Sequence, residues 1–445
     1  MRSERLVWLG VWLGLLLSLG ACSTAHYPIN QPRSADSPVP GYEFPLLRGD
    51  LNNSDSLFLY VGVSGGGSRA AALGFGVLQA LAQQRIHWAG SERRLFDEID
   101  VVSGVSGGSM LAAYHALYGE AVLNRFETDF LQVDLQRELV SRSLSPSNLL
   151  RLSSLRFGRV EMLAELLDER LYRGASYNDL RQRGRRPFLI VTAADMTTGR
   201  RFEFMTHQFD QLCSDLTSFP ISRAVAASSA LPIVLSPLTL WNYRGNCADP
   251  GPHDPRRYVH LLDGGLSDNL SARGPLDFIA RSGGIVRGTR AASFRHVRQV
   301  VFLLVNAETA ASPGDDDNAN VPGTFRTVRA LVDIPINRYS ADSLTELRQT
   351  VAQWQEQVRS ASVQERGDTF EPDVEFRMIE VSLAREPDPA LRARLMAIPT
   401  TLRLAPDDLD LLTRYGADSL RAAPEYQSLL RALQVPAGRA AAAAP

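Results

Sequence analysis

The sequence predicts an α/β fold in which a mostly parallel central sheet is covered by helices on both faces. Short apolar runs of strand type alternate with longer segments whose apolar residues recur at helical spacing. Two of these runs end in glycine-rich turns that lead directly into a helix-like segment, as expected where parallel strands are joined by crossover helices. The composition, 44% hydrophobic and 22% charged over 445 residues, is that of a globular protein with ample chain for a buried core.

The N-terminal segment is predicted to be an export signal that takes no part in the fold. Two arginines flank an apolar stretch over residues 6–19, which is short for a membrane span but has the length of a signal-peptide core. The stretch ends in LGAC, whose last residue is Cys22. This tetrapeptide resembles the lipobox of bacterial lipoproteins, in which the cysteine is lipidated and begins the mature protein. The resemblance implies a signal peptide over residues 1–21 and a lipid anchor at Cys22. An ordinary secretory signal with an incidental cysteine is the alternative.

The same resemblance bears on location. Ser23 follows the cysteine, which by analogy with such lipoproteins indicates the bacterial cell envelope and its outer membrane, on the side facing the periplasm. The next segment is polar and contains several prolines, so residues 22–55 are expected to form a lipidated tether. A net charge of −2 gives no sign of nucleic-acid binding.

The folded part is expected to begin near Ser56, with a main domain over residues 56–310. Strand-like runs lie at 57–63, 99–102, 187–194, 201–205, 258–262, 297–305 and 374–381. The segments 135–180 and 321–359 are helical or loop-like and are expected to flank the sheet. Residues 311–435 form an extension that completes or flanks the domain, and residues 436–445 form a low-complexity, disordered tail.

The turn after the second run places a serine where a nucleophile would be needed. Its sequence, GVSGG, holds Ser106 between Gly104 and the pair Gly107 and Gly108. In a nucleophile elbow the serine lies in a sharp strand-to-helix turn, free of neighbouring side chains, and the helix N-terminus stabilises negative charge. The pattern is only moderately specific, because glycine and serine are common in turns.

The turn after the first run offers backbone donors that would complement such a serine. It consists of Gly65, Gly66, Gly67, Ser68 and Arg69. Between a strand and a helix, N–H groups can point at an anion and form an oxyanion hole. A phosphate loop for a nucleotide is the alternative, but GGGSRA has neither the GK[ST] ending of a P-loop nor the GxGxxG spacing.

A carboxylate follows the run at 258–262. Asp263 ends that run, and Gly264 and Gly265 after it leave the carboxylate little covered. Taken alone, such a segment is more often an ordinary turn that closes a strand.

Together and in this order, GGGSRA, GVSGG and DGG resemble the motifs of the patatin-like phospholipase family. A fourth block, AVAASSALPIVLSP at 224–237, is similar to the family's AxxASSAxP segment. The resemblance covers about residues 57–276 and implies a three-layer patatin-like fold. One departure is Ala70, where the family pattern has glycine.

The resemblance also implies roles. Ser106 would attack an acyl ester of a membrane lipid, Asp263 would accept its proton without a histidine, and N–H groups around Gly66, Gly67 and Ser68 would bind the oxyanion. Arg69 would cap the site or meet a lipid phosphate, or else lie on the helix surface. No metal and no organic cofactor is implied. The apolar stretches 112–117 and 233–240 are candidates for an acyl channel or for ordinary core.

Other interpretations stay open at this point. A Ser-His-Asp esterase would combine Ser106 with Asp195 or Asp263 and with His260 or His296. His87 and His115 are expected in helices, in structural roles. An acyltransferase would share the acyl-enzyme. A non-catalytic envelope scaffold would need neither Ser106 nor Asp263.

Two cysteines remain after Cys22. Cys213 and Cys247 each lie in a polar, loop-like segment and are candidates for a disulfide in an oxidising periplasm. No CxxC or HxxxH spacing accompanies them, so a metal site is not predicted there.

Overall fold

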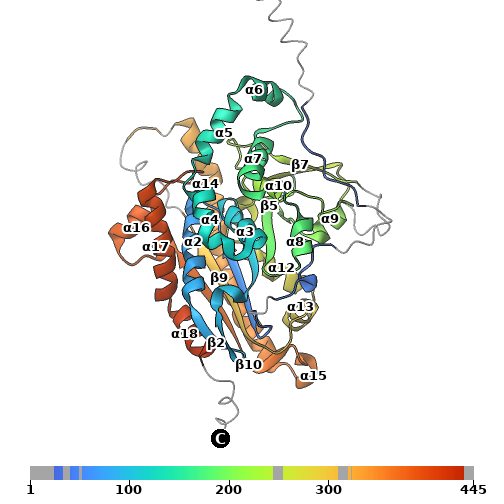
Figure 1. Ribbon diagram of the computed structural model, residues 1–445, viewed down its shortest axis with the longest axis vertical. Helices are drawn as coiled ribbons and strands as arrows, with labels where there is room; N and C mark the ends of the chain where they lie inside the picture. The colour runs from blue at the N-terminus through green and yellow to red at the C-terminus, as the bar shows by residue number, and fades with distance from the viewer. Residues whose placement is uncertain are drawn as a thin grey trace, which may run out of the picture.

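The computed structural model describes residues 25–33, 41–49, 53–243, 254–308, 319–321 and 323–434. At its centre lies an eight-stranded mixed sheet with helices on both sides (Figure 1). The strand order is β10-β9-β1-β4-β5-β8-β7, and β6 pairs with β5 beside this path. The strands of the sheet are β1 (Leu57–Val63), β4 (Ile99–Val105), β5 (Phe188–Asp195), β6 (Arg201–Glu203), β7 (Leu238–Trp241), β8 (Tyr258–Asp263), β9 (Val297–Asn306) and β10 (Phe370–Ser382).

The five strands from β10 to β5 run parallel, so their carboxyl ends share one edge of the sheet. β8 pairs antiparallel with only the last three residues of β5, and β7 pairs antiparallel with β8. Because β10 is the edge strand beside β9, the C-terminal part of the chain contributes directly to this sheet.

Two helices pack on one face of the sheet, and a longer helix packs on the opposite face. α2 (Ser68–Gln83) follows β1, and α3 (Gly107–Tyr118) follows β4. α17 (Pro406–Ala422) lies against α2 at two glycines, where an added Cβ on Gly76 would stand 2.0 Å from the Thr413 carbonyl oxygen. On the opposite face Trp354 of α14 (Thr324–Ser360) packs against Phe302 of β9, with ring centroids 5.8 Å apart.

The remaining helices lie around these layers. They are α4 (Val122–Phe126), α5 (Leu135–Ser143), α6 (Pro146–Leu152), α7 (Arg159–Leu167), α8 (Tyr177–Arg183), α9 (Thr206–Gln211), α10 (Ile221–Ser228), α11 (Gly265–Asp268), α12 (Arg273–Arg281), α13 (Ile285–Ala291), α15 (Val363–Arg366), α16 (Pro389–Met396) and α18 (Pro424–Leu433). In the described part of the chain, none of the helices combines the length and the apolar character needed to cross a bilayer.

The predicted fold class is confirmed, and each of the seven predicted strand runs is a strand. Two features were not predicted: β7 and a separate hairpin of β2 (Arg85–Trp88) and β3 (Ser91–Arg94). The hairpin carries His87, so the expectation that His87 lies in a helix is wrong. Both features are short, and the hairpin is rich in charged residues, so neither has the apolar run of a core strand.

The expectation of a free tether over residues 22–55 is also wrong for the parts that the structure describes. Tyr42 is only 1% exposed, stacks on Phe188 with centroids 4.6 Å apart, and its hydroxyl accepts a hydrogen bond from the Leu189 N–H at 2.8 Å. Asn30 is also buried and hydrogen-bonds to the backbone of Trp241 in both directions. Polar composition suggested exposure, but a buried aromatic ring and paired hydrogen bonds to the backbone hold these short stretches against the domain.

Several expectations concern residues outside the described part. These are the export signal with Cys22, the tail at 436–445, and Cys247. Cys213, within the described part, is disulfide-bonded and buried.

Candidate active site

Ser106 occupies the turn between β4 and α3, at the carboxyl edge of the sheet. Its backbone has φ 51° and ψ −124°, a conformation that non-glycine residues rarely adopt and that is typical of a strained functional turn. The next residue must be glycine, because a Cβ on Gly107 would lie 2.0 Å from the Gly67 carbonyl oxygen. The two glycine-rich turns are therefore in direct contact.

Asp263 reaches Ser106 from the other side of β5. Val105 pairs with Thr192 and Asp263 pairs with Ala193, so β5 lies between the serine turn and the aspartate. The Ser106 Oγ donates a hydrogen bond to Asp263 Oδ2 at 2.9 Å, and the Gly265 N–H donates to Oδ1 at 2.8 Å. Burial raises the pKa of Asp263 to about 6, against the lowering effect of these two hydrogen bonds. A carboxylate with such a pKa is ionised at neutral pH and is a stronger base than an exposed aspartate.

The segment at the end of α10 holds both residues in place. Ser228 Oγ accepts from the Ser106 N–H at 2.8 Å and donates to the Thr192 carbonyl at 2.6 Å. The Gly264 N–H donates to the Ser228 carbonyl at 3.1 Å, and the Asp263 N–H donates to the Ala230 carbonyl at 3.0 Å. The fourth sequence block is thus a clamp between the serine turn and the aspartate.

The glycine-rich loop after β1 offers fewer free donors than the sequence suggested. The Gly65 N–H donates to the Asn269 carbonyl at 3.0 Å, and the Ser68 N–H donates to the Thr401 carbonyl at 2.8 Å. Ser68 is therefore not an available oxyanion donor, which corrects that expectation. Within the described part of the chain, the N–H groups of Gly66 and Gly67 have no acceptor. Both line the cleft beside Ser106, so they are the donors available to an oxyanion.

Arg69 lines the cleft, as expected of a residue that caps the site, but the other two expectations for its side chain are wrong. The side chain is neither on the helix surface nor free for a phosphate, because Arg69 is only 1% exposed. Its Nη1 donates to the Ile398 carbonyl at 2.6 Å, and its Nη2 donates to the Ala307 carbonyl at 2.7 Å and to Thr400 Oγ1 at 3.2 Å. Arg69 thus connects the start of α2 to the C-terminal segment around Thr400.

A cleft of about 140 Å³ surrounds the two residues. Its walls include residues that sequence patterns did not single out, namely Ser229, Leu231, Asn269, Ala307, Glu308, Asp333, Ile336, Asn337, Thr400, Thr401 and Leu402. The Ser229 hydroxyl is buried in the cleft wall without a hydrogen-bond partner in the described structure. Ser229 and Leu231 lie inside the fourth block, and Asn269 lies four residues after the DGG motif, so these three were within reach of motif analysis. The other residues come from the loop after β9, from α14 and from the loop around Thr400, for which the sequence carries no local signal.

Histidines are absent from the described lining of the cleft. His260 instead pairs through Nδ1 with Thr239 Oγ1 at 3.0 Å, and exposed His296 pairs with Glu371 at 2.8 Å. His115 is buried and in contact with Phe96, and burial lowers its pKa to about 3. Asp195 is bound by Arg256 at 2.6 Å. The geometry therefore does not favour a Ser-His-Asp arrangement built from these residues.

The two apolar stretches proposed as an acyl channel are not among the cleft residues. Residues 112–117 belong to α3, where Ala112 and Ala113 are fully buried, and the end of the stretch 233–240 forms buried positions of β7. No group of three or more His, Cys, Asp or Glu side chains in the described residues is arranged to hold a metal ion.

Comparison with known proteins gives one family match. Residues 63–276 match the model of the patatin-like phospholipase family. No curated protein sequence gives a significant match.

Among solved structures, human GIVD cytosolic phospholipase A2 in complex with methyl gamma-linolenyl fluorophosphonate is similar at 13% identity and a TM-score of 0.41. The match covers 85% of this chain and 59% of that one, so the chain spans about three-fifths of the human protein's length. VipD from Legionella pneumophila is similar at 13% identity and a TM-score of 0.32, over 85% of this chain and 67% of that chain.

Proposed function

Because residues 63–276 form a patatin-like phospholipase domain, a family of lipid hydrolases, we propose that this protein hydrolyses acyl esters of membrane lipids with Ser106 as nucleophile and Asp263 as base. The observation that carries this proposal is the 2.9 Å hydrogen bond from the Ser106 hydroxyl to a buried aspartate. A serine hydroxyl is a weak nucleophile, so it needs a base within hydrogen-bond reach.

The proposed reaction has two halves. Ser106 Oγ attacks the ester carbonyl carbon while its proton passes to Asp263, and the oxyanion is bound by the N–H groups of Gly66 and Gly67. When the tetrahedral intermediate collapses, Asp263 returns the proton to the leaving alkoxide, and an acyl-enzyme on Ser106 remains. Water attacks the acyl-enzyme while its proton passes to Asp263, and when the second tetrahedral intermediate collapses Asp263 gives this proton to Ser106 Oγ, which releases the fatty acid and the free serine.

A membrane surface is the proposed source of the substrate, and exposed leucines support it. We call the exposed Leu144, Leu149, Leu150 and Leu155 the α6 patch; Leu155 is fully exposed. Ile233 and Val234, each half exposed, are tied to the segment that follows the patch, since Nη2 of Arg159, four residues after Leu155, donates to the Ile233 carbonyl at 2.9 Å. Leu231, two residues earlier, lines the cleft. Contiguous exposed apolar residues that adjoin a site are typical of membrane or protein contact surfaces.

The N-terminal segment supports an orientation in which the α6 patch faces the membrane. The Ala25 carbonyl accepts a hydrogen bond from Ser154 Oγ at 2.5 Å, and the Tyr27 N–H donates to the Arg156 carbonyl at 2.7 Å. A lipid on Cys22, three residues before Ala25, would therefore bring the α6 patch to the membrane. We propose this anchor, and with it an outer-membrane location facing the periplasm.

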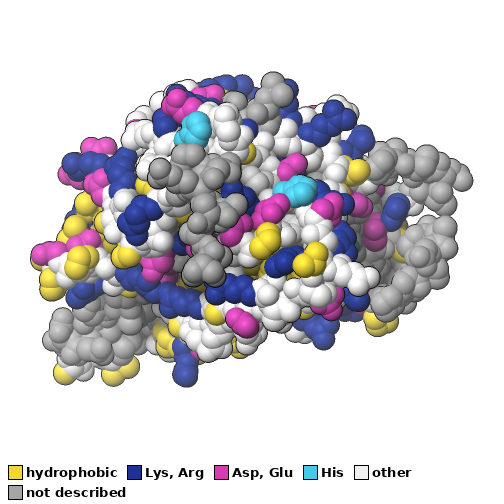
Figure 2. All heavy atoms as spheres, turned by 90° about the horizontal axis from the view of Figure 1, so that it is seen from below, with side chains coloured by type: hydrophobic (Ala, Val, Ile, Leu, Met, Phe, Trp, Pro, Cys, Tyr) yellow, Lys and Arg dark blue, Asp and Glu magenta, His cyan; other side chains and the backbone are white. Residues whose placement is uncertain are grey.

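The opposite end of the molecule has a different surface. Figure 2 shows it from below, with arginine and acidic side chains interspersed. Ion pairs there include Arg298 with Asp373 at 2.7 Å and Arg295 with Asp368 at 3.0 Å. A mixed, paired surface of this kind favours solvent over a lipid phase.

The test is hydrolysis of a nitrophenyl butyrate and of labelled phospholipid vesicles by detergent-purified full-length protein, compared with three variants. Ser106→Ala and Asp263→Asn are expected to reduce both activities by at least about a thousandfold, as for loss of a nucleophile or base. His260→Ala is expected to keep them. Retained activity in Ser106→Ala would overturn the assignment, and loss of activity in His260→Ala alongside normal folding would favour a histidine-dependent mechanism.

A further inference from the structure

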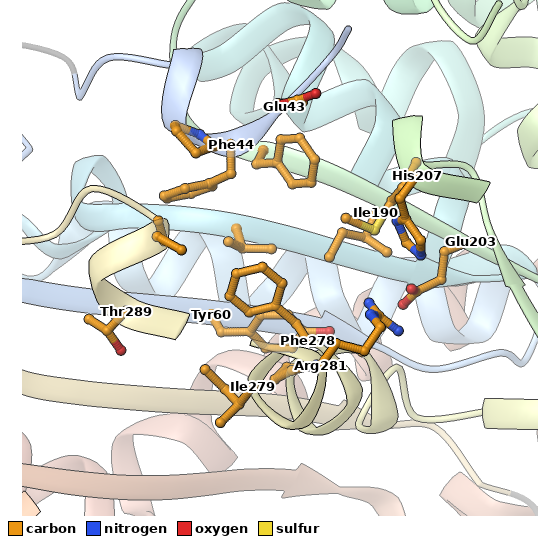
Figure 3. Close-up of a pocket in the computed structure, with 18 of the residues that line it drawn as sticks. Glu43, Phe44, Tyr60, Ile190, Glu203, His207, Phe278, Ile279, Arg281 and Thr289 are labelled. Carbon is orange, nitrogen blue, oxygen red and sulfur yellow. The ribbon is translucent and has the colours of Figure 1, made fainter. Parts of the chain in front are cut away.

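An apolar cavity of about 410 Å³ lies on the α14 side of the sheet. Its floor is formed by β9, β1, β4 and β5, and its roof by α12, α13 and the short helix η1 (Phe44–Leu46) (Figure 3). It shares no lining residue with the cleft at Ser106. Val101 lines the cavity and precedes Ser106 by five residues along the chain of β4. Five residues of extended strand span about 16 Å, so this is the approximate distance from Ser106 to the cavity wall.

Aromatic side chains make up a large part of the wall of this cavity. Six phenylalanines contribute to it, namely Phe44, Phe58, Phe188, Phe278, Phe294 and Phe302. Protein interiors are packed almost without voids larger than a water molecule. A cavity of this size lies instead in the range of about 300–1,000 Å³ that is usual for sites that bind small molecules.

One end of the cavity is polar. Figure 3 shows Glu203, His207 and Arg281 beside one another at this end, and Thr289 at the other. Glu203 is 1% exposed, and neither of its carboxylate oxygens has a hydrogen bond in the described structure, although Arg201 Nε lies 3.3 Å away. Arg281 is exposed at the rim and has no hydrogen bond or ion pair to any described residue.

These groups determine which polar group a ligand would carry at this end of the cavity. The planar guanidinium of Arg281 can donate two parallel hydrogen bonds to a carboxylate of a ligand. The Glu203 carboxylate can share a proton with that same carboxyl group. Burial, with smaller effects of Arg281 and Arg201, lowers the pKa of His207 to about 4, so this ring is neutral at pH 7. The cation at this end is therefore Arg281.

We propose that this cavity is a second lipid site that binds one long-chain fatty acid, with the carboxyl group between Arg281 and Glu203 and the alkyl chain among the phenylalanines toward Thr289. A single flexible alkyl chain suits an apolar cavity of about 410 Å³ that has polar groups at one end. The proposal does not depend on hydrolysis at Ser106, although a fatty acid is also the acyl product of the proposed reaction.

Displacement of a fluorescent fatty acid from the full-length protein tests the proposal. Palmitic acid is expected to displace the probe, and methyl palmitate, which has no charge to pair with Arg281, is expected to be at least about tenfold weaker when both are compared in Ser106→Ala, which cannot hydrolyse the ester. Arg281→Ala is expected to weaken palmitic acid binding by about tenfold, whereas the control Arg287→Ala, an exposed arginine of α13 outside the cavity, is expected to leave it unchanged. Equal binding of acid and ester, or no effect of Arg281→Ala, would overturn the proposal.

A second variant tests where the chain lies. Thr289→Trp would fill the far end, so octanoic acid is expected to bind normally and palmitic acid to bind at least about tenfold more weakly. Unchanged nitrophenyl butyrate hydrolysis would show that this variant is folded. Ser106→Ala is expected to bind palmitic acid like the parent protein. If Ser106→Ala lost the binding, the probe would be reporting the cleft at Ser106, and the separate site would be refuted.

Discussion

The backbone N–H of Ser106 donates to Ser228 Oγ at 2.8 Å, and this hydroxyl in turn donates to the Thr192 carbonyl of β5. The backbone amide of the proposed nucleophile is therefore used to fix its own turn. Because the φ angle of Ser106 is 51°, the strained turn needs such an external support. Ser228 acts on the reaction through this support, without touching the reacting atoms.

Replacing Ser228 by alanine is expected to lower kcat more than it changes KM. The change removes the acceptor of the Ser106 N–H and a donor to the Thr192 carbonyl, at a cost of about 1–3 kcal/mol in total, and lets the proposed nucleophile leave its position. Steady-state kinetics with nitrophenyl butyrate and urea unfolding measure the two effects. Ser222→Ala, on the same helix and away from the cleft, is the control and is expected to keep kcat. An unchanged kcat in Ser228→Ala would contradict a positioning role.

Activity is expected to require the ionised form of Asp263. With its pKa raised to about 6 by burial, the carboxylate is protonated below that pH and cannot accept the Ser106 proton. The value of kcat/KM for a soluble ester is therefore expected to fall about tenfold per pH unit below pH 6 and to be flat just above it. A pH profile that stays flat down to pH 4 would argue against Asp263 as the base.

The same burial predicts that Asp263 lowers the stability of the native state. The folded pKa, about 6, lies above the ordinary value of 3.8, so the parent protein loses stability as the pH rises from about 4 to 6. Asp263→Asn keeps an acceptor for the Gly265 N–H but has no charge to bury. Relative to the parent, it is expected to gain about 2–3 kcal/mol of unfolding free energy at pH 7 but little at pH 4. Urea unfolding of both proteins at the two pH values is the measurement, and a gain that is equal at both would contradict this origin.

Arg69 is expected to be essential for stability. Arg69→Leu leaves the carbonyls of Ile398 and Ala307 without their donor, which is expected to cost at least about 3 kcal/mol of unfolding free energy. The control is Arg403→Leu, because the Arg403 side chain is 64% exposed. A stable Arg69→Leu protein that has lost only phospholipid turnover would instead support contact with a lipid phosphate.

The α6 patch is expected to control activity on vesicles alone. Replacing Leu149, Leu150 and Leu155 by serine removes apolar area that would enter the membrane, so vesicle binding and vesicle hydrolysis are expected to fall by at least about tenfold. Nitrophenyl butyrate hydrolysis is expected to stay unchanged. Val363→Ser is a matched control, since Val363 is 77% exposed on α15, which lies far from α6 (Figure 1).

Sequence patterns were sufficient for seven of the eight strands of the central sheet and for selecting Ser106 and Asp263 as candidates, because both depend on local signals. These strands contain short apolar runs, and Ser106 and Asp263 each stand at the end of such a run beside glycines. The part of the cleft contributed by the C-terminal segment around Thr401 could not be predicted in the same way. Thr401 lines the cleft and binds the Ser68 N–H through its carbonyl, an interaction in which the side chain takes no part.

Arg69 shows a further limit of sequence patterns. Its position after three glycines is compatible with a phosphate contact, with a surface position and with a buried brace, and the choice depends on what packs over α2. Here it is the chain around Ile398 and Thr400, more than 300 residues later, which has no strand or helix periodicity. Tertiary contacts between distant loops decide such cases.

The connection between Arg69 and Ile398 also bears on when activity can arise during synthesis. Ser106 and Asp263 are translated well before Ile398 and Thr401, but the loop that holds Gly66 and Gly67 is completed only by those later residues. A ribosome-bound chain that ends before them has Ser106 and Asp263 but lacks the residues that hold the Gly66–Gly67 loop. The proposed activity would therefore arise only after nearly the whole polypeptide has been synthesised.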